Sequence, residues 1–312
     1  MAPPAPTPRR ILVTGAGGFV GRHLMPALAE HLPGAEAVAA GADLADPGAV
    51  EAELRAARPD AVVHLAAVSA VGAAREDPDR AWRVNVLGTL ALGRAILAHA
   101  PRCLLLFASS ADCYGESFRP GAPLSESAPL APANPYAATK AAADLALGAM
   151  VPDGLRLVRA RPFNHTGPGQ APAFAVPAFA RQAARIAAGL QPPVVHVGNL
   201  EPRRDFLDVR DVCAAYALCL ARADALPPGA ILNLASGEAR RIGDVLGDVL
   251  RVAGVEARVE ASAARLRPAD LPVARGDAGL ARRLLGWTPR VPWAETLRDV
   301  VADWRGRVAA GE

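Results

Sequence analysis

The sequence predicts an α/β protein built on a doubly wound parallel Rossmann sheet, with a smaller α/β domain interwoven on its C-terminal side. Two observations predict this fold. Short apolar runs alternate with alanine-rich stretches of helical length, and the first run leads directly into a glycine-rich turn. The runs are ILVTG, AEAVAA, AVVHLAA, CLLLFASS and LRLVRARP, beginning at residues 11, 35, 61, 103 and 155. Apolar strands separated by helical crossovers are typical of a parallel sheet covered on both faces.

The pattern changes after residue 163, where loops rich in proline and glycine separate the elements. Helices are expected near 174–189, 209–223, 241–253 and 293–308, and further strands at PVVHVG and AILNLASG. A chain of 312 residues exceeds one typical domain. We therefore expect a Rossmann domain formed by residues 9–163 and 206–235, and a second domain formed by 164–205 and 236–312. The proline-rich lead 1–8 lacks an apolar signal core and is expected to be disordered.

Composition excludes several classes of function. With 34 basic and 31 acidic residues the net charge is only +3, which does not favour a nucleic-acid surface and suits a small or phosphorylated ligand. No window is long and apolar enough for a membrane span. The cysteines have no metal-ligand spacing, so we expect buried free thiols in a reducing cytoplasm, and no metal site. They are Cys103, Cys113, Cys213 and Cys219.

The stretch ILVTGAGGFVGRHL is a candidate phosphate loop. Gly15 permits a tight turn after the first strand, Gly18 allows the backbone to approach a pyrophosphate, and Gly21 allows close packing of strand and helix. The N-terminus of the following helix favours an anion. A glycine triplet in this position predicts a dinucleotide cofactor.

The choice of dinucleotide depends on the end of the second strand. An NAD site usually carries a carboxylate there, but this segment is VAAGADL, in which alanines stand where that acid would be and Asp43 is the nearby candidate. Arg22, directly after the last glycine, could face the 2′-phosphate of NADP. These residues favour NADP(H), with NAD(H) as the alternative.

A tyrosine and a lysine lie four positions apart in NPYAATKAAAD. On a helix, Tyr136 and Lys140 share one face, and a nearby ammonium is expected to lower the pKa of the phenol. The predicted fourth strand ends in FASSADCYG, whose Ser110 could polarise a carbonyl. The helix would present the two side chains rigidly as a proton donor and an aid to cofactor binding.

These motifs, together with TGxxGxxG, HLAA and NVLGT, resemble an extended short-chain dehydrogenase/reductase acting on a nucleotide sugar, over residues 9–305. The resemblance implies that Ser110, Tyr136 and Lys140 are catalytic. It also implies a set of cofactor-binding residues. They are Gly15, Gly18, Phe19, Val20, Gly21, Arg22, Asp43, Leu44, Leu65, Ala66, Ala67, Asn85, Tyr136 and Lys140.

Three further motifs, RPFNHTGPGQ, GNLEPRRDFLDVRDV and RPADLPVARGD, are similar to the branch of this family that handles GDP-4-keto-6-deoxy-mannose. The resemblance implies that Asn164, Arg204 and Arg267 bind the nucleotide sugar together with Ser110. Positive charge and amide donors are what a nucleotide diphosphate requires. The second domain would therefore bind the nucleotide sugar.

The type of reaction depends on Asp112. Dehydratases of this superfamily carry an additional acid/base, typically Glu, at this position, whereas the reductase of this branch has Asp. The resemblance therefore favours NAD(P)H-dependent reduction of the 4-keto group to GDP-D-rhamnose. A GDP-mannose 4,6-dehydratase, a nucleotide-sugar 4-epimerase and a dinucleotide-binding redox sensor remain as alternatives. Two apolar helices near 80–100 and 135–150 resemble the pair that forms a homodimer in relatives.

Overall fold

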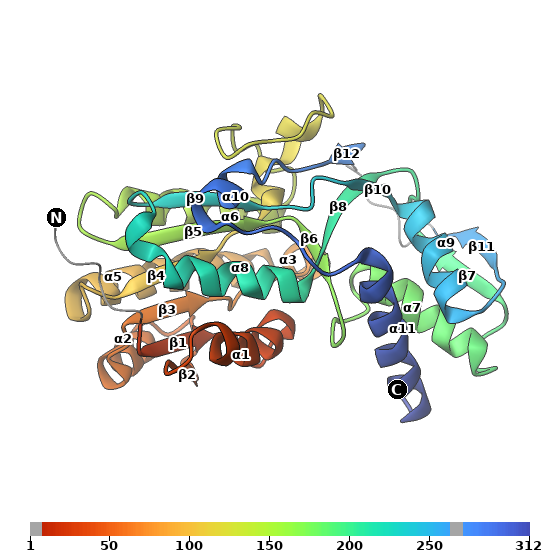
Figure 1. Ribbon diagram of the computed structural model, residues 1–312, viewed down its shortest axis with the longest axis horizontal. Coiled ribbons are helices and arrows are strands. Elements are labelled where there is room, and N and C mark those ends of the chain that lie inside the picture. The colour runs from red at the N-terminus through yellow and green to blue at the C-terminus, as the bar shows by residue number, and fades with distance from the viewer. Residues whose placement is uncertain (1–7, 263–270) are drawn as a thin grey trace.

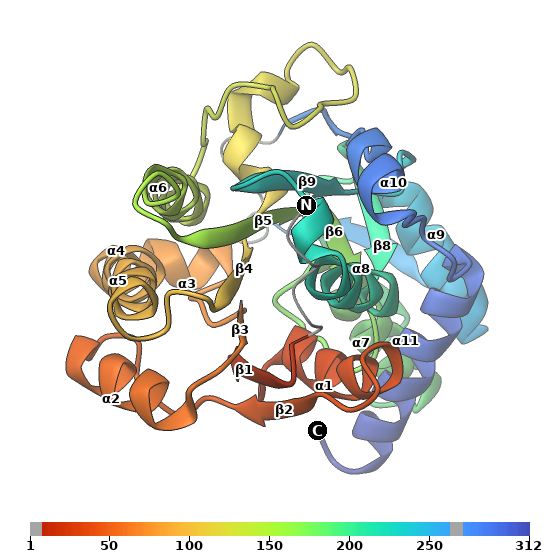
Figure 2. The same ribbon diagram turned by 60° about the vertical axis from the view of Figure 1, so that its left-hand side comes forward.

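A six-stranded parallel sheet forms the centre of the protein (Figure 2). The computed structural model describes residues 8–262 and 271–312; most of the proline-rich lead and the predicted substrate residue Arg267 lie outside these residues. The strands are, in spatial order, β2 (Glu36–Ala39), β1 (Arg10–Thr14), β3 (Ala61–His64), β4 (Leu104–Ala108), β5 (Arg156–Pro162) and β9 (Ala230–Leu234). This order, with β2 and β3 on opposite sides of β1, confirms the predicted doubly wound sheet.

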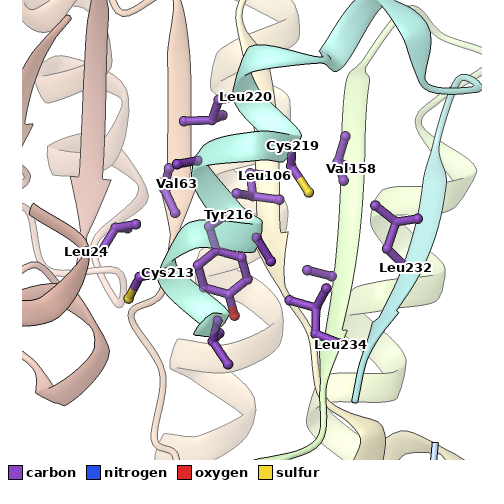
Figure 3. Close-up of a cluster of buried hydrophobic side chains, with 14 of the residues drawn as sticks. Leu24, Val63, Leu106, Val158, Cys213, Tyr216, Cys219, Leu220, Leu232 and Leu234 are labelled. Carbon is purple, nitrogen blue, oxygen red and sulfur yellow. The ribbon is translucent and has the colours of Figure 1, made fainter. Parts of the chain in front are cut away.

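Helices cover both faces of this sheet (Figure 2). One face carries α2 (Pro47–Ala57), α3 (Val71–Glu76), α4 (Pro78–Trp82), α5 (Thr89–His99) and α6 (Pro135–Ala149), and the other carries α1 (Phe19–His31), α8 (Val209–Ala221) and α10 (Gly279–Leu285). Alternate residues of each strand face opposite cores, as the pleat requires. On β4, for example, Leu105 packs with α2 and α5, whereas Leu106 packs with α8 (Figure 3).

A smaller part of the chain lies beyond one end of the large sheet (Figure 1). Its core is formed by α7 (Ala175–Ala187), α9 (Ile242–Ala253) and α11 (Trp293–Ala309), beside the parallel pair β7 (Val194–Val197) and β11 (Arg258–Ala261). A second sheet has the order β10 (Ala239–Arg241), β8 (Arg203–Asp208), β12 (Val273–Ala274), and β6 (Asn164–Thr166) also pairs with β8. Because β9 returns to the six-stranded sheet after these elements begin, the two parts are interwoven.

The expected helix near 80–100 is interrupted. A π-helical segment, Arg83–Gly88, joins α4 to α5. Its last residue, Gly88, packs closely against the loop after β2, because a Cβ there would lie 2.5 Å from the backbone oxygen of Leu44. Such π-helical turns often accompany functional residues, and this one contains Asn85. Short 3-10 segments at Ala111–Phe118 and Ala223–Ala225 complete the described elements.

The four cysteines are free and buried, as predicted. Among residues 8–262 and 271–312, no helix has the length and apolar character needed to cross a membrane. Within the same ranges, no cluster of three or more histidine, cysteine, aspartate or glutamate side chains has a geometry able to hold a metal ion.

Candidate active site

The glycine turn after β1 forms a narrow backbone cradle. Gly15 has φ of +72°, and a Cβ there would lie 2.8 Å from the amide nitrogen of Ala66. A Cβ on Gly21 would lie 2.4 Å from the carbonyl oxygen of Gly15, so only glycine fits at either position. Gly18 caps α1 and donates its N–H to the Gly15 carbonyl at 3.0 Å. The cradle therefore has the open backbone and helix N-terminus that a dinucleotide pyrophosphate requires.

A buried histidine holds the neighbouring strand ends in place. His64 Nδ1 lies 2.7 Å from Thr14 Oγ1, and its Nε2 lies 2.9 Å from Thr89 Oγ1. Thr14 Oγ1 also accepts the N–H of Ala66, and Thr89 Oγ1 donates to the carbonyl of Asn85. Burial lowers the pKa of His64 to about 3, with a smaller effect from the charge of Lys140. A neutral ring therefore links β1, β3 and α5 at the edge of the cradle.

Asn85 braces the loop that follows β3. Its Oδ1 accepts the N–H of Val68 at 2.7 Å, and its Nδ2 donates to the Val68 carbonyl and to Thr139 Oγ1 at 3.1 and 2.9 Å. The loop contains the predicted cofactor residues Leu65, Ala66 and Ala67. The side chain of Asn85 therefore fixes this loop against α6, because its amide is engaged with protein groups.

Helix α6 brings the predicted catalytic side chains to the end of β4. Asn134 caps the helix by accepting the N–H of Ala137 at 2.9 Å, and Pro135 occupies its first turn. Tyr136 and Lys140 follow one turn apart on the same helix. The hydroxyl of Ser110 lies near enough to the Tyr136 phenol to lower its pKa, and it accepts the N–H of Asp112 at 3.1 Å. Three side chains predicted from distant motifs thus meet at one edge of the sheet.

The phenol is not acidified in the way the sequence suggested. Burial raises the pKa of Tyr136 above its ordinary value, the negative charge of Asp112 raises it further, and the hydrogen bond from Ser110 only partly offsets this. The expected lowering of the Tyr136 pKa by Lys140 is wrong for this arrangement, because Lys140 is not among the groups that shift this pKa. The Lys140 Nζ lies over the Phe107 ring, 4.4 Å from its centre. The phenol is therefore protonated at neutral pH and is a proton donor.

Lys140 is the only lysine in the sequence, although the chain has 34 basic residues. It is only 3% exposed. Burial lowers its pKa to about 8, while Cys113 and Asp144 act in the opposite direction. An arginine could not replace it as a compact cation with an adjustable pKa.

An aspartate that the motif analysis missed connects α6 to the strands. Asp144 is 0% exposed, and its carboxylate accepts hydrogen bonds from Ser109 Oγ at 2.6 Å, Arg161 Nε and Nη2 at 3.0 and 2.8 Å, and Arg159 Nη1 at 3.2 Å. Ser109 directly precedes Ser110. The signal available in the sequence was spacing, because Asp144 follows Lys140 by one helical turn.

Arg22 lies against the glycine cradle, and Asp43 lies in the loop between β2 and α2. Arg22 donates from Nη1 to the carbonyl of Gly17 at 2.8 Å and from Nη2 to the carbonyl of Gly169 at 3.0 Å. Asp43 accepts the N–H of Ala45 at 2.9 Å and borders a cavity of about 250 Å³. The cavity is lined by Asp43, Ala45, Asp77, Arg80, Arg83 and Val84.

The other predicted residues lie around the cradle and the β6–β8 pair. The carbonyl of Val20 accepts a hydrogen bond from the thiol of Cys213. Leu44, in the loop between β2 and α2, is buried. The Phe19 ring stacks on His165 of β6, with ring centres 6.2 Å apart. The β6–β8 pair carries two predicted substrate residues. Asn164 is exposed at the start of β6, and Arg204 on β8 donates from Nη1 to the carbonyl of Leu271 at 2.7 Å.

Comparison with known proteins agrees with this geometry. The model of the NAD dependent epimerase/dehydratase family matches residues 11–235. The chain belongs to this family. A GDP-6-deoxy-D-mannose reductase from Pseudomonas aeruginosa is 39% identical over 96% of the chain and 98% of its own length. This family likeness confirms the resemblance seen in the sequence motifs, and it makes the chain an NAD(P)-dependent oxidoreductase.

Solved structures extend the family comparison to the fold. RMD from Pseudomonas aeruginosa, complexed with NADPH, has a TM-score of 0.86 and 35% identity, covering 96% of this chain and 99% of its own. The UDP-glucose 4-epimerase of Thermus thermophilus, complexed with NAD, has a TM-score of 0.81 and 31% identity, covering 95% and 99%. Members of the family with either dinucleotide therefore share this architecture.

The single lysine allows a direct test of the electrostatics. We expect the ¹³Cε resonance of Lys140, in protein labelled only at lysine, to titrate near pH 8 rather than at the ordinary pKa of 10.5. Because the folded pKa is the lower one, the cost of burying the ammonium is fully present below pH 8 and disappears as the pH rises to 10.5. The free energy of unfolding of Lys140→Met, measured with urea, should therefore exceed that of the wild type by the largest amount below pH 8. A titration near the ordinary lysine value would contradict this electrostatic account.

Proposed function

We propose that the protein reduces the 4-keto group of GDP-4-keto-6-deoxy-D-mannose to give GDP-D-rhamnose, with NAD(P)H as the reductant. The observation that carries this proposal is the meeting of Ser110 and Tyr136 at the end of β4, where the Ser110 hydroxyl is close enough to lower the pKa of the phenol. The name of the Pseudomonas aeruginosa relative, GDP-6-deoxy-D-mannose reductase, supports the choice of substrate. A nucleotide sugar is in any case the class of substrate that the similar proteins share.

The catalytic roles follow from the protonation states of the side chains. NAD(P)H supplies a hydride when it is bound. Tyr136, which is protonated at neutral pH, donates a proton to the oxygen of the ketone, and the Ser110 hydroxyl stabilises the charge that develops there. Lys140, a cation below pH 8, would hold a ribose hydroxyl of the bound dinucleotide and help to return the phenol to its protonated form. The neutral Tyr136 suits the reductive direction, in which the enzyme must give up a proton.

We assign the smaller part, residues 164–205 and 236–312, to binding of the nucleotide sugar. Asn164 and Arg204 lie on neighbouring strands, β6 and β8, at the junction with the large sheet. Together with Arg267 they supply the amide and guanidinium donors that a diphosphate requires. The Rossmann part, residues 9–163 and 206–235, binds the dinucleotide. Cytoplasmic location is part of the same proposal, since the four cysteines are unpaired.

A second candidate reaction is 4,6-dehydration of GDP-mannose. The observation that favours it is Asp112, a carboxylate close enough to Tyr136 to raise its pKa. GDP-mannose 4,6 dehydratase 2 of Arabidopsis thaliana is 30% identical over 83% of the chain. The reductase is the better candidate because the aspartate is one methylene shorter than the glutamate of dehydratases. Incubation with GDP-mannose and NAD(P)⁺, without reduced dinucleotide, separates the two reactions, since only the dehydratase would form the 4-keto sugar.

Removing one hydroxyl tests the proton donor. With the purified ketosugar and NAD(P)H, Tyr136→Phe is expected to lower kcat by a factor of about 10² to 10⁴, the range for loss of a general acid. Dinucleotide binding, measured by nicotinamide fluorescence, should persist. Tyr216→Phe removes a phenol beneath the sheet and serves as the matched control, with activity close to that of the wild type. Full turnover by Tyr136→Phe would contradict this mechanism. Separately, NMR of the product formed by the wild type would identify the sugar.

We also propose that two copies of the chain associate through α4, the π-helical segment and α6. Trp82, Leu87 and Leu145 are 45%, 59% and 59% exposed on these elements, and α6 packs directly against the other two. Large exposed apolar side chains gathered on adjacent helices are typical of an interface. They come from the two apolar segments that resemble the dimer helices of the family.

A charge placed in this apolar surface should separate the copies. Light scattering should give the mass of a dimer for the wild type and of a monomer for Leu145→Glu, because an unpaired carboxylate at an interface is costly. Leu190→Glu changes an equally large side chain, 56% exposed on a distant loop, and should leave the dimer intact. A monomeric wild type, or a Leu145→Glu variant that still forms dimers, would rule out this surface.

A further inference from the structure

The loop after β2 holds a carboxylate that comes from a different element. Glu53, in the middle of α2, accepts the N–H of Gly41 on Oε1 at 2.6 Å and the N–H of Ala42 on Oε2 at 3.1 Å. Each carboxylate oxygen keeps a lone pair for another donor. A negative charge is thus fixed at the end of the second strand, although the strand end itself contains no acid.

This position lies beside the glycine cradle. β1 and β2 pair with Val13 opposite Ala39, and the N–H of Ala40 donates to the Val13 carbonyl. Gly41 therefore follows β2 at the same edge of the sheet at which the glycine turn follows β1. In a doubly wound fold the adenosine ribose of a dinucleotide lies at this edge, and a carboxylate there accepts its 2′-hydroxyl.

We propose that Glu53 selects the dinucleotide: its carboxylate accepts the 2′-hydroxyl of NAD(H) and repels the 2′-phosphate of NADP(H). The proposal depends on the dinucleotide site of the family and is independent of which ketosugar is reduced. A 2′-phosphate carries up to about two negative charges near neutral pH. It would also need donors such as the N–H groups of Gly41 and Ala42, which Glu53 already engages.

The basic residue that could have accommodated a phosphate is engaged elsewhere. Both terminal nitrogens of Arg22 donate to backbone carbonyls, one in the cradle and one at Gly169. The Gly169 N–H in turn donates to Asp303 of α11 at 3.0 Å. Arg22 thus connects the cradle to the smaller part of the protein, and the carboxylate of Glu53 is the charged group that engages the backbone of Gly41 and Ala42 directly after β2. The expected preference is for NAD(H).

Binding measurements without any sugar test this assignment separately from the reaction. Titration of the wild-type protein with NADH and with NADPH, followed by nicotinamide fluorescence, should give a lower Kd for NADH. Glu53→Gln keeps a side-chain acceptor but removes the charge, so it should tighten NADPH binding by about tenfold and weaken NADH binding only modestly. Because Glu53 is partly exposed, 1 M salt should screen its charge and reduce the ratio of the NADPH to the NADH dissociation constant of the wild type.

Glu51→Gln is the matched control, since Glu51 lies on the same helix but points to His99 at 2.8 Å. It should leave the ratio of the two dissociation constants unchanged. The proposal is overturned if the wild type binds NADPH at least as tightly as NADH. It is also overturned if Glu53→Gln changes both affinities by the same factor, because a purely structural role of Glu53 in the loop predicts that result. Even if Glu53→Gln does not fold, a wild type without a preference for NADH overturns the proposal.

Discussion

The buried carboxylate of Asp144 is the interaction on which the arrangement of the site depends. It is completely inaccessible to water, and breaking a buried ion pair of this kind typically costs about 3–5 kcal/mol because a charge is left without a partner. Through Arg161 and Arg159 it attaches α6 to β5, and through Ser109 it attaches α6 to the end of β4. The helix that carries Tyr136 and Lys140 is therefore held against the strand end that carries Ser110.

A second set of polar contacts, centred on neutral His64, holds the elements together on the cofactor side. It joins the strand ends of β1 and β3 to α5, and Asn85 extends it to the loop after β3 and to α6. The glycine cradle and the proposed catalytic hydroxyls are thus braced against one another through α6. Lys140 lies between these connections, and as the only lysine of an arginine-rich chain it is the one cation whose pKa burial can bring close to neutrality.

The periodicity of the sequence predicted the fold well, and motif spacing predicted most of the site. Apolar runs identified the parallel strands. Of the predicted glycine triplet, Gly15 and Gly21 stand where a Cβ would clash with neighbouring backbone atoms. The raised pKa of Tyr136 was not predictable, because burial and the proximity of Asp112 depend on tertiary packing. The contact of Glu53 with the loop after β2 was missed for the same reason: an acid placed on a crossover helix has no fixed spacing from the strand that it serves.

The central claim is that the Ser109–Asp144 contact acts on the reaction by placing Ser110 beside Tyr136. A double-mutant cycle of Ser109→Ala and Ser110→Ala tests it most directly, with kcat for ketone reduction as the readout and dinucleotide binding as the control. We expect Ser109→Ala to lower kcat about tenfold in the wild type and hardly at all when Ser110 is already alanine, since residues that act through one another are not additive. Equal effects of Ser109→Ala in both backgrounds would contradict the claim.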